Sequence, residues 1–259
     1  GQNFLIDTNV LDKIISSAEI TKDDCVLEIG PGFGTMTQYL AEAAKEVIAV
    51  EIDKSLIPIL HETLADYENV TIINEDILKV DIAKLVEEKN GGKPIKVVAN
   101  LPYYITTPII FKLLSETKIK QFTFMVQKEV GDRLTGKPNT KDYNSLSVAM
   151  EYKTNSKVAY KVSPNSFYPA PKVDSALLVM KVKKMDSDAN FDAQFLKFVQ
   201  EIFSQRRKTV INNLNGKYSY DKQKLIDLFN ENNININLRA ETMTVNDILE
   251  LYNMIISNQ

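Results

Sequence analysis

The strongest constraint on the fold is an alternation between short apolar runs and helical patterns in the first half of the chain. Runs of strand length cover residues 25–30, 46–53, 69–76, 95–100 and 121–127, and helical periodicity fills several of the intervals between them. This alternation predicts βαβ units, in which parallel strands form one sheet with helices on both faces. Two later runs with strand-like alternation bring the predicted sheet to seven strands, at residues 157–163 and 175–182.

The pattern changes near residue 185, after which only helical periodicity is present. The polar stretch MDSDANFD precedes helical patterns at residues 191–203, 208–214, 221–233 and 244–256. A polar segment followed by an all-helical sequence is typical of a domain boundary. We therefore expect an α/β domain over residues 1–184 and a small all-helical domain over residues 185–259.

Composition excludes several classes of protein. The 259 residues include a single cysteine, Cys25, so an internal disulfide is impossible and a reducing, cytoplasmic location is expected. No run approaches the roughly 18 apolar residues of a transmembrane helix. The chain begins at Gly1 without methionine, inside a recognisable motif, so we expect further residues upstream.

Charge is distributed unevenly along the chain. Lys and Arg number 9 against 18 Asp and Glu in residues 1–100, 14 against 6 in residues 101–184, and 8 against 10 in residues 185–259. The three differences are −9, +8 and −2, and they add up to the net charge of −3. The middle third therefore predicts a basic surface suited to a phosphate backbone, with chance clustering on solvated faces as the alternative.

A glycine-rich turn, EIGPGFGT, lies between the first predicted strand and the next helix. Gly30, Gly32 and Gly34 would let the backbone turn tightly and approach a ligand closely. Their spacing is G-x-G-x-G, which differs from the G-x-G-x-x-G of the dinucleotide fingerprint. By itself the turn is weak evidence of binding.

Two acidic residues end the next two strands. Glu51 follows Gly30 by 21 residues, where an acid can hold the ribose hydroxyls of an adenosine-containing cofactor, and Asp76 can accept from an adenine amino group. Each could equally be a solvated strand end. Together they favour a cofactor at the carboxyl edge of the sheet, where open α/β sheets bind ligands.

This combination resembles the class I S-adenosylmethionine-dependent methyltransferases. The resemblance implies a Rossmann-like, mostly parallel seven-stranded sheet with helices on both faces, and S-adenosyl-L-methionine as cofactor. NAD is the second candidate, and the glycine spacing and the lack of a hydride-transfer constellation count against it. NLPYY then falls at the end of the fourth strand, where amino methyltransferases of this class carry Asn/Asp-x-Pro-Tyr/Phe.

The NLPYY segment suits methyl transfer to an adenine amine, whose lone pair is delocalised into the ring. The Asn100 side chain and the Leu101 carbonyl can accept hydrogen bonds from that amine. Pro102 would fix the backbone, and Tyr103 could stack on an extruded base with roughly 1–3 kcal/mol. The alternative is an Asn-Pro turn with packed tyrosines, which is the interpretation we keep for Tyr104.

Further segments resemble one family, the ribosomal RNA adenine dimethyltransferases, over nearly the whole chain. They are GQNFL (1–5), EIGPGFGT, EID, NED, NLPYY and FYPAPKVDSAL (167–177), and the segments FSQRRKTVINNL (203–214) and LRAETMTVNDI (238–248) are similar to the small-subunit branch of the family. The resemblance implies dimethylation of N6 of two adjacent adenosines in a hairpin loop near the 3′ end of small-subunit (16S) rRNA, during ribosome biogenesis. Ala240 departs from the usual proline, and the basic segment that usually precedes GQNF is not in this sequence.

The resemblance also implies a role for each matching residue. Those expected to bind or surround the cofactor are Gln2, Asn3, Phe4, Leu5, Gly30, Gly32, Gly34, Glu51, Ile52, Asp76, Ile77 and Asn100. Those expected to act on the target base are Asn100, Leu101, Pro102, Tyr103 and Phe167, where Phe167 would stack on the face opposite Tyr103. Those expected to meet RNA phosphate are Arg206, Arg207 and Lys208. No metal is expected.

Three functions remain compatible with the sequence. The first is methylation of small-subunit rRNA within immature small subunits by a monomeric enzyme. The second is an assembly factor that mainly binds these particles and methylates them secondarily. The third is methylation of large-subunit rRNA, as in the macrolide-resistance branch of the family.

Overall fold

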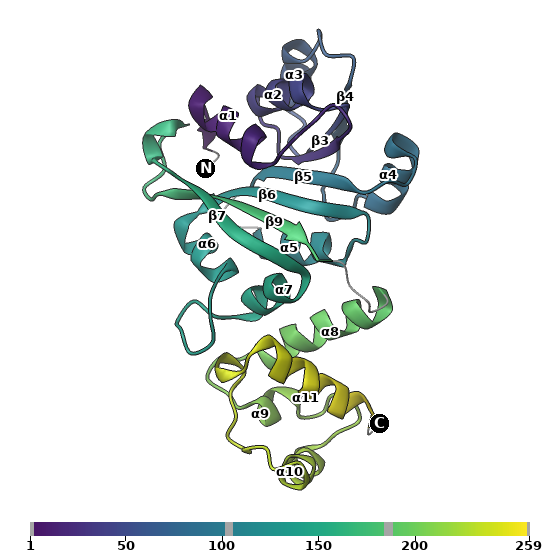
Figure 1. Cartoon of the computed structure of the whole chain (residues 1–259), viewed down its shortest axis with the longest axis vertical. Coiled ribbons are helices and arrows are strands. Elements are labelled where there is room, and N and C mark those ends of the chain that lie inside the picture. Colours follow the sequence, from purple (N-terminus) through teal and green to yellow (C-terminus); the bar gives the residue numbers. More distant parts are fainter. Residues whose placement is uncertain (1–2, 102–105, 184–188, 258–259) are drawn as a thin grey trace. The chain divides into compact units, whose positions relative to one another are not determined.

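The computed structural model of the chain describes residues 3–101, 106–183 and 189–257 (Figure 1). Gln2, Pro102, Tyr103 and Tyr104 lie outside these residues, so the structure does not bear on the roles expected for them. Among the described residues, no helix has the length and apolar character needed to cross a membrane.

The chain divides into two compact units. The first comprises Gly1–Gly131 and Thr154–Lys183, and the second comprises Asp132–Lys153 and Lys184–Gln259. The second unit therefore includes an internal segment that the sequence analysis placed in the α/β domain. The reason is packing, because the helix in that segment contacts the C-terminal helices of the second unit.

The first unit is built on a seven-stranded sheet with the order β4-β3-β2-β5-β6-β9-β7. All neighbouring strands from β4 to β6 are parallel, and β9 is antiparallel to both β6 and β7. The mostly parallel Rossmann-like sheet predicted from the sequence is confirmed. The strands are β2 (Cys25–Ile29), β3 (Glu46–Glu51), β4 (Val70–Asn74), β5 (Ile95–Asn100), β6 (Ile119–Gln127), β7 (Thr154–Val162) and β9 (Ser175–Val182).

The strand order reverses between β2 and β5. The chain runs from β2 outward to β3 and β4, and then returns to place β5 on the other side of β2. Loops that leave the carboxyl ends of β2 and β5 therefore separate in opposite directions. This is the point of an open α/β sheet at which a ligand crevice forms.

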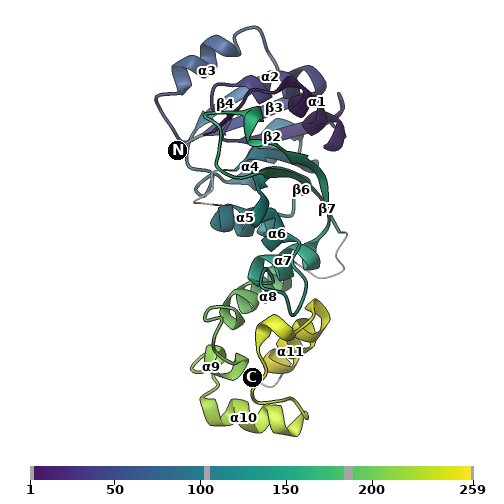
Figure 2. The same ribbon diagram turned by 90° about the vertical axis from the view of Figure 1, so that its left-hand side faces the viewer.

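Helices cover both faces of this sheet, with α1, α2 and α3 on one side and α4 and α5 on the other (Figure 2). Asp7 caps α1 through the Asn9 amide, and Asp81 caps α4 through the Lys84 amide. The sequence analysis did not anticipate α4 or α6. The helices that begin in this unit are α1 (Thr8–Ser17), α2 (Thr35–Ala43), α3 (Ile57–Thr63), α4 (Ile82–Asn90), α5 (Thr106–Ser115) and α6 (Lys128–Leu134).

The core on the α1/α2 side brings the chain's N-terminal segment against the sheet. Leu11 and Ile14 of α1 and Leu40 of α2 are each at most 1% exposed, and they pack in one cluster with Val26 of β2 and Val98 of β5. Because β2 and β5 carry alternate side chains toward this cluster, Glu28 and Asn100 face the same side of the sheet. The apolar packing thus fixes where the polar strand ends point.

A second, two-stranded sheet was not predicted from the sequence. β1 (Phe4–Leu5) pairs antiparallel with β8 (Phe167–Tyr168), with Leu5 opposite Phe167. The side-chain amide of Asn3 donates to the Pro169 carbonyl oxygen at 2.6 Å. These contacts hold the first described residues of the chain in place beside β5.

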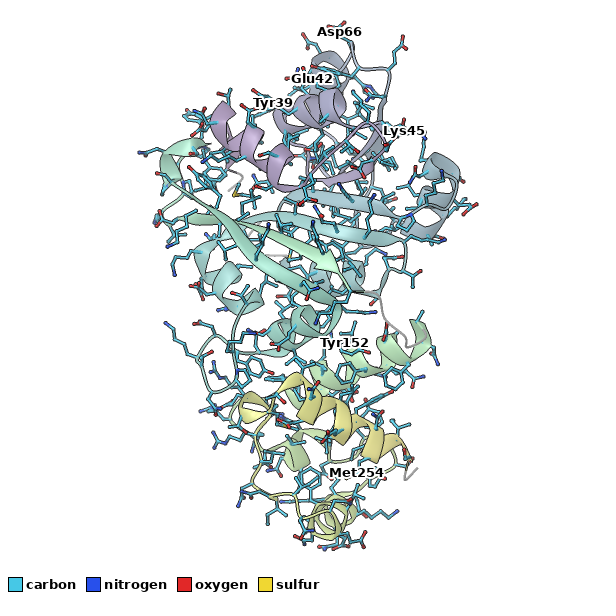
Figure 3. The ribbon with its side chains drawn as sticks, viewed as in Figure 1. Tyr39, Glu42, Lys45, Asp66, Tyr152 and Met254 are labelled. Atoms are coloured by element: carbon cyan, nitrogen blue, oxygen red, sulfur yellow. The ribbon has the colours of Figure 1, made fainter. Side chains whose placement is uncertain are left out.

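The second unit is helical apart from short turns. Tyr152, at the end of α7, stacks on Phe195 with ring centroids 4.5 Å apart and donates to Asp192 at 2.7 Å (Figure 3). Asp192 also forms an ion pair with Lys153, which joins α7 to α8. The helices are α7 (Ser145–Lys153), α8 (Ala189–Ile202), α9 (Val210–Leu214), α10 (Lys222–Glu231) and α11 (Val245–Ser257). The polar stretch expected at the boundary is therefore helical from Ala189 onward.

Candidate active site

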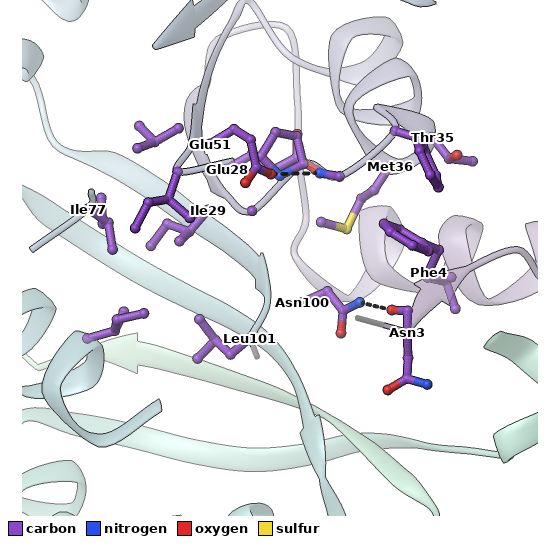
Figure 4. A pocket seen from close by; sticks show the side chains of 18 of the residues that line it. Asn3, Phe4, Glu28, Ile29, Thr35, Met36, Glu51, Ile77, Asn100 and Leu101 are labelled. Carbon is purple, nitrogen blue, oxygen red and sulfur yellow. Dashed lines mark hydrogen bonds between the residues drawn. The ribbon is translucent and has the colours of Figure 1, made fainter. Parts of the chain in front are cut away.

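A cavity of about 220 Å³ opens at the carboxyl ends of β2, β3 and β5, at the reversal of the strand order (Figure 4). Its walls come from the β1 segment, from the turns after β2, β3 and β4, and from the end of β5. Ten of the residues expected to bind or surround the cofactor line it: Asn3, Phe4, Leu5, Gly30, Gly32, Glu51, Ile52, Asp76, Ile77 and Asn100. The sequence thus predicted both the place of the cavity and most of its polar groups.

The glycine turn has the left-handed backbone that its sequence predicted. Gly30 and Gly32 have φ values of 70° and 62°, a region that residues with a side chain rarely adopt. A Cβ atom added to Gly32 would lie 3.0 Å from the Phe4 ring. Gly34 differs from the expectation: it precedes α2 with φ 86° and packs against α3, and it is not among the cavity residues.

Glu51 is only 3% exposed, and both of its carboxylate oxygens accept backbone hydrogen bonds. Oε2 accepts from the Gly32 amide at 3.2 Å, and Oε1 accepts from the Asp53 amide at 2.9 Å. The glycine turn and the β3 strand end are therefore tied together across the cavity. The carboxylate is held rigidly where a pair of ribose hydroxyls would be recognised.

The turn after β4 supplies a polar group between apolar walls. Asp76 is half-buried, and its side chain accepts from the Leu78 amide at 2.9 Å. Ile77 is 6% exposed, whereas Ile52, after β3, is 62% exposed. An acid beside branched apolar side chains suits a flat heteroaromatic ring that carries an amino group.

Asn100 lies at the end of β5 and is tied to the N-terminal segment. Its side-chain amide donates to the Asn3 carbonyl oxygen at 3.1 Å, which fixes the orientation of the amide (Figure 4). Leu101 follows, 1% exposed, and its backbone amide donates to the Met125 carbonyl of β6. Both residues expected to hold the target amine therefore have constrained positions on the cavity wall.

An aromatic pair on the cavity wall was only partly anticipated. The rings of Phe4 and Phe33 lie 4.2 Å apart, and Phe33 is 41% exposed. Phe33 occupies the variable position of the glycine turn, so the sequence pattern gave no reason to single it out. Its partly exposed ring gives the cavity an apolar edge.

Glu28 is a buried cavity acid to which the sequence analysis assigned no role. It is the single acidic residue of β2, it is 0% exposed, and neither carboxylate oxygen has a hydrogen-bond partner among the described residues. Burial raises the pKa of its carboxyl group to about 8, and the charge of Glu51 contributes to the rise. A charged residue inside an otherwise apolar strand is the signal that could have identified it.

Phe167 lies outside the cavity. It is 3% exposed and packs in the α1/α2 core cluster, and it does not line the cavity. Its expected stacking on a target base stays a prediction. The exposed aromatic residue of the segment is its neighbour Tyr168, at 72%.

The basic segment of the second unit forms a turn between α8 and α9. Arg206, Arg207 and Lys208 are all exposed, and Arg206 lies 3.7 Å from Glu241. The side chain of Asn213, 6% exposed, donates to the carbonyl of Ile202 at 2.6 Å and fixes the base of the turn. The turn therefore presents its cations to solvent on a defined support.

The acidic side chains that line the cavity suit a positively charged cofactor that contains adenosine. Four acids, Glu28, Glu51, Glu75 and Asp76, line it, and among the described lining residues there is no lysine, arginine or histidine. The sheet topology, the glycine turn and these acids define a class I methyltransferase that uses S-adenosyl-L-methionine.

Comparison with known proteins narrows this class. The chain belongs to the ribosomal RNA adenine dimethylase family, which its sequence matches over residues 1–257. The family resemblance inferred from the motifs is thereby confirmed. The protein is an enzyme, an adenine dimethyltransferase of ribosomal RNA.

Individual relatives agree with this assignment. The chain is 53% identical to the ribosomal RNA small subunit methyltransferase A of Lachnoclostridium phytofermentans, over 98% of this chain and 90% of that protein. It is 45% identical to the protein of the same name from Clostridioides difficile, over 98% and 89%. A dimethyladenosine transferase from Plasmodium falciparum has 28% identity and a TM-score of 0.76, over 96% of this chain and 95% of that one. The 23S rRNA methyltransferase ErmE has 26% identity and a TM-score of 0.68, over 99% and 100%.

Proposed function

We propose that the enzyme dimethylates N6 of two adjacent adenosines in a hairpin loop near the 3′ end of small-subunit rRNA. The observation that carries the proposal is the position of Asn100, whose amide is fixed on the wall of the cofactor cavity at the end of β5. The relatives named small subunit methyltransferase A, at 45–53% identity, support this choice of rRNA.

The assignment of cofactor groups to residues follows from the chemistry of the cavity. Glu51 would accept from the ribose hydroxyls and Asp76 from the adenine amino group, with Ile77 against the ring. Gly30 and Gly32 would lie against the methionine part, because the absence of side chains lets the backbone approach closely. When bound, S-adenosylmethionine supplies an electrophilic methyl group.

The target amine would be held by Asn100 and Leu101. The Asn100 side-chain oxygen and the Leu101 carbonyl can accept both N–H bonds of the adenine amino group. Such bonds favour a pyramidal nitrogen, whose lone pair is then free to form the new N–C bond while the sulfur keeps the electrons of the bond that breaks. The ammonium product loses its proton to water, so the transfer needs no strong base.

The test is methyl transfer by Asn100→Ala to small subunits from a strain that lacks the modification. We expect a loss of at least about a hundredfold in transfer rate, with S-adenosylmethionine still bound, because the change removes an interaction made in the transition state. Asn155→Ala, at an exposed position of the edge strand β7, is the matched control and should transfer normally. Wild-type transfer by Asn100→Ala, or label found only in the large-subunit rRNA when both subunits are offered, would refute the proposal.

We also propose that the exposed turn of Arg206, Arg207 and Lys208 binds rRNA phosphate in immature small subunits. A phosphate contact contributes about 0.7–0.9 to the slope of log affinity against log salt concentration. Arg207→Glu should weaken particle binding and reduce that slope, whereas Lys222→Glu, exposed on α10, should do neither. An unchanged slope in Arg207→Glu would rule out this contact.

Particle binding by Asn100→Ala separates the two roles of the protein. If it binds particles as wild type does while transfer is lost, recognition and catalysis are independent, as the assembly-factor hypothesis requires.

We propose a cytoplasmic monomer as the acting species. Light scattering of the purified protein at working concentration tests the monomer, and a dimer mass would contradict it.

A further inference from the structure

Glu28 has an environment that none of the other cavity acids shares. It lies on β2, a strand buried along its whole length, and its side chain reaches the cavity between the glycine turn and β5 (Figure 4). In the part of the chain that the structure describes, neither carboxylate oxygen has a hydrogen-bond partner. A buried carboxylate without a partner is strongly disfavoured, so the group takes up a proton instead.

The described groups that face Glu28 offer no compensating positive charge. Thr37, on α2, is the polar neighbour that favours the ionised form, but its hydroxyl is outside hydrogen-bonding geometry and likewise lacks a partner. On β5, Val98 is its register partner and Asn100 is the next residue on that face, and neither titrates. On β3, Glu51 is the titratable group that acts on it, and its charge raises the pKa of Glu28 further.

The cavity nevertheless has to accept a cation. The methionine end of S-adenosylmethionine carries an ammonium and a sulfonium group against one carboxylate. A positive charge near a buried carboxyl group favours the ionised form and lowers its pKa. Binding of the cofactor would therefore supply the partner that Glu28 lacks in the structure.

We propose that Glu28 is uncharged in the cofactor-free enzyme and ionises when the methionine end of S-adenosylmethionine enters the cavity, so that cofactor binding releases a proton. The carboxyl O–H bond breaks, the electron pair stays on Glu28, and the proton passes to the buffer. Glu28 is thus a positioning residue that couples cofactor charge to proton release. The inference rests on the proposed placement of the cofactor, with its methionine part near the glycine turn.

The number of protons released follows from the raised pKa. With a pKa of about 8, Glu28 is about nine-tenths protonated at pH 7, so full ionisation releases about 0.9 proton per cofactor bound. Isothermal titration calorimetry of the full chain in buffers of different ionisation enthalpy measures this number. The slope of observed enthalpy against buffer ionisation enthalpy is the proton count.

Two variants measure how much Glu28 contributes to the proton release. Glu28→Gln keeps the size of the side chain and cannot ionise, so its slope should be smaller than that of wild type by about 0.9 proton. Glu46→Gln, at the start of β3 and outside the cavity lining, is the matched control and should keep the wild-type slope. Equal slopes for Glu28→Gln and wild type would overturn the proposal.

A ligand control applies to the unmodified protein, and it holds even if Glu28→Gln does not fold. Methylthioadenosine keeps the adenosine part but lacks the charged methionine end, so it should bind without release from Glu28. Equal proton release for methylthioadenosine and S-adenosylmethionine would overturn the proposal. If S-adenosylmethionine binds and methyl transfer requires Asn100 while no proton is released, only the role of Glu28 fails. If transfer does not require Asn100, the proposed function fails.

Discussion

Replacing Glu28 by glutamine should remove a pH dependence of stability from the cofactor-free enzyme. A carboxyl group with an ordinary pKa of 4.5 in the unfolded chain and about 8 in the folded state binds a proton on folding between these values. Its contribution to stability is fully present below pH 4.5 and is lost as the pH rises through 8. The free energy of unfolding of the wild-type protein should therefore decrease over this window.

The magnitude follows from the shift in pKa. The difference of about 3.5 units corresponds to a ceiling of about 5 kcal/mol, since each unit is worth 1.36 kcal/mol. Between pH 6 and pH 8 the folded state gradually loses the proton, and the expected decrease is about 2 kcal/mol. That is a substantial part of the roughly 5–15 kcal/mol that stabilises a typical domain.

The assay is urea unfolding at pH 6 and pH 8 without cofactor, followed by far-UV circular dichroism because the chain has no tryptophan. The two compact units can unfold separately, so hydrogen exchange of the β2 amides identifies the transition that belongs to the first unit. Wild type should lose about 2 kcal/mol more than Glu28→Gln between these pH values. Parallel pH profiles for the two proteins would refute the assignment of an uncharged Glu28.

Two further predictions concern backbone strain and a buried ion pair. Gly32→Ala should cost about 1–2 kcal/mol of stability and weaken S-adenosylmethionine binding, measured by calorimetry. Gly91 also has a positive φ, but the space around it is open. Gly91→Ala should therefore leave the binding of S-adenosylmethionine unchanged. Asp24→Asn should destabilise the protein by about 3 kcal/mol in urea unfolding at pH 7. The substitution removes the ion pair of 2.9 Å between Asp24 and Lys96 and leaves the Lys96 ammonium buried without an opposite charge. The second lysine that pairs with Asp24, Lys120, is half exposed. These two lysines lower the pKa of Asp24 to about 2, so the wild-type protein should lose this stabilisation as the pH falls from 3.8 toward 2, and Asp24→Asn should not.

The sheet was predictable because strand identity is encoded locally. β2, β3 and β5 are continuous apolar runs bounded by turn residues, and the predicted ranges differ from the observed ones by at most two residues. The helices α4 and α7 were missed for different reasons. α4 is short and has acids and lysines on most of its surface, and in α7 nearly every residue from Leu146 to Met150 is buried, so no amphipathic period is present.

The candidate site was predictable where its residues end strands. Glu51, Asp76 and Asn100 were found because parallel strands place their carboxyl ends on one edge. The burial of Phe167 was not predictable because it depends on the pairing of β8 with β1, which joins segments about 160 residues apart and leaves no local signal. Glu28 stands at the start of the motif EIGPGFGT, but the motif predicts a role only for its glycines.

Glu28 and Glu51 are two glutamates of one cavity whose carboxyl groups differ in their hydrogen bonding. Both are almost fully buried, and they lie on adjacent strands on the same face of the sheet. The left-handed turn at Gly32 aims its amide at Glu51, which also accepts from the Asp53 amide, whereas Glu28 has no donor among the described residues. In the proposed placement of the cofactor, Glu51 would then be a fixed acceptor for the neutral sugar, and Glu28 would gain a partner when the cationic methionine end binds. Specificity for a positively charged methyl donor would on this proposal depend on the glycine turn as well as on the acids themselves.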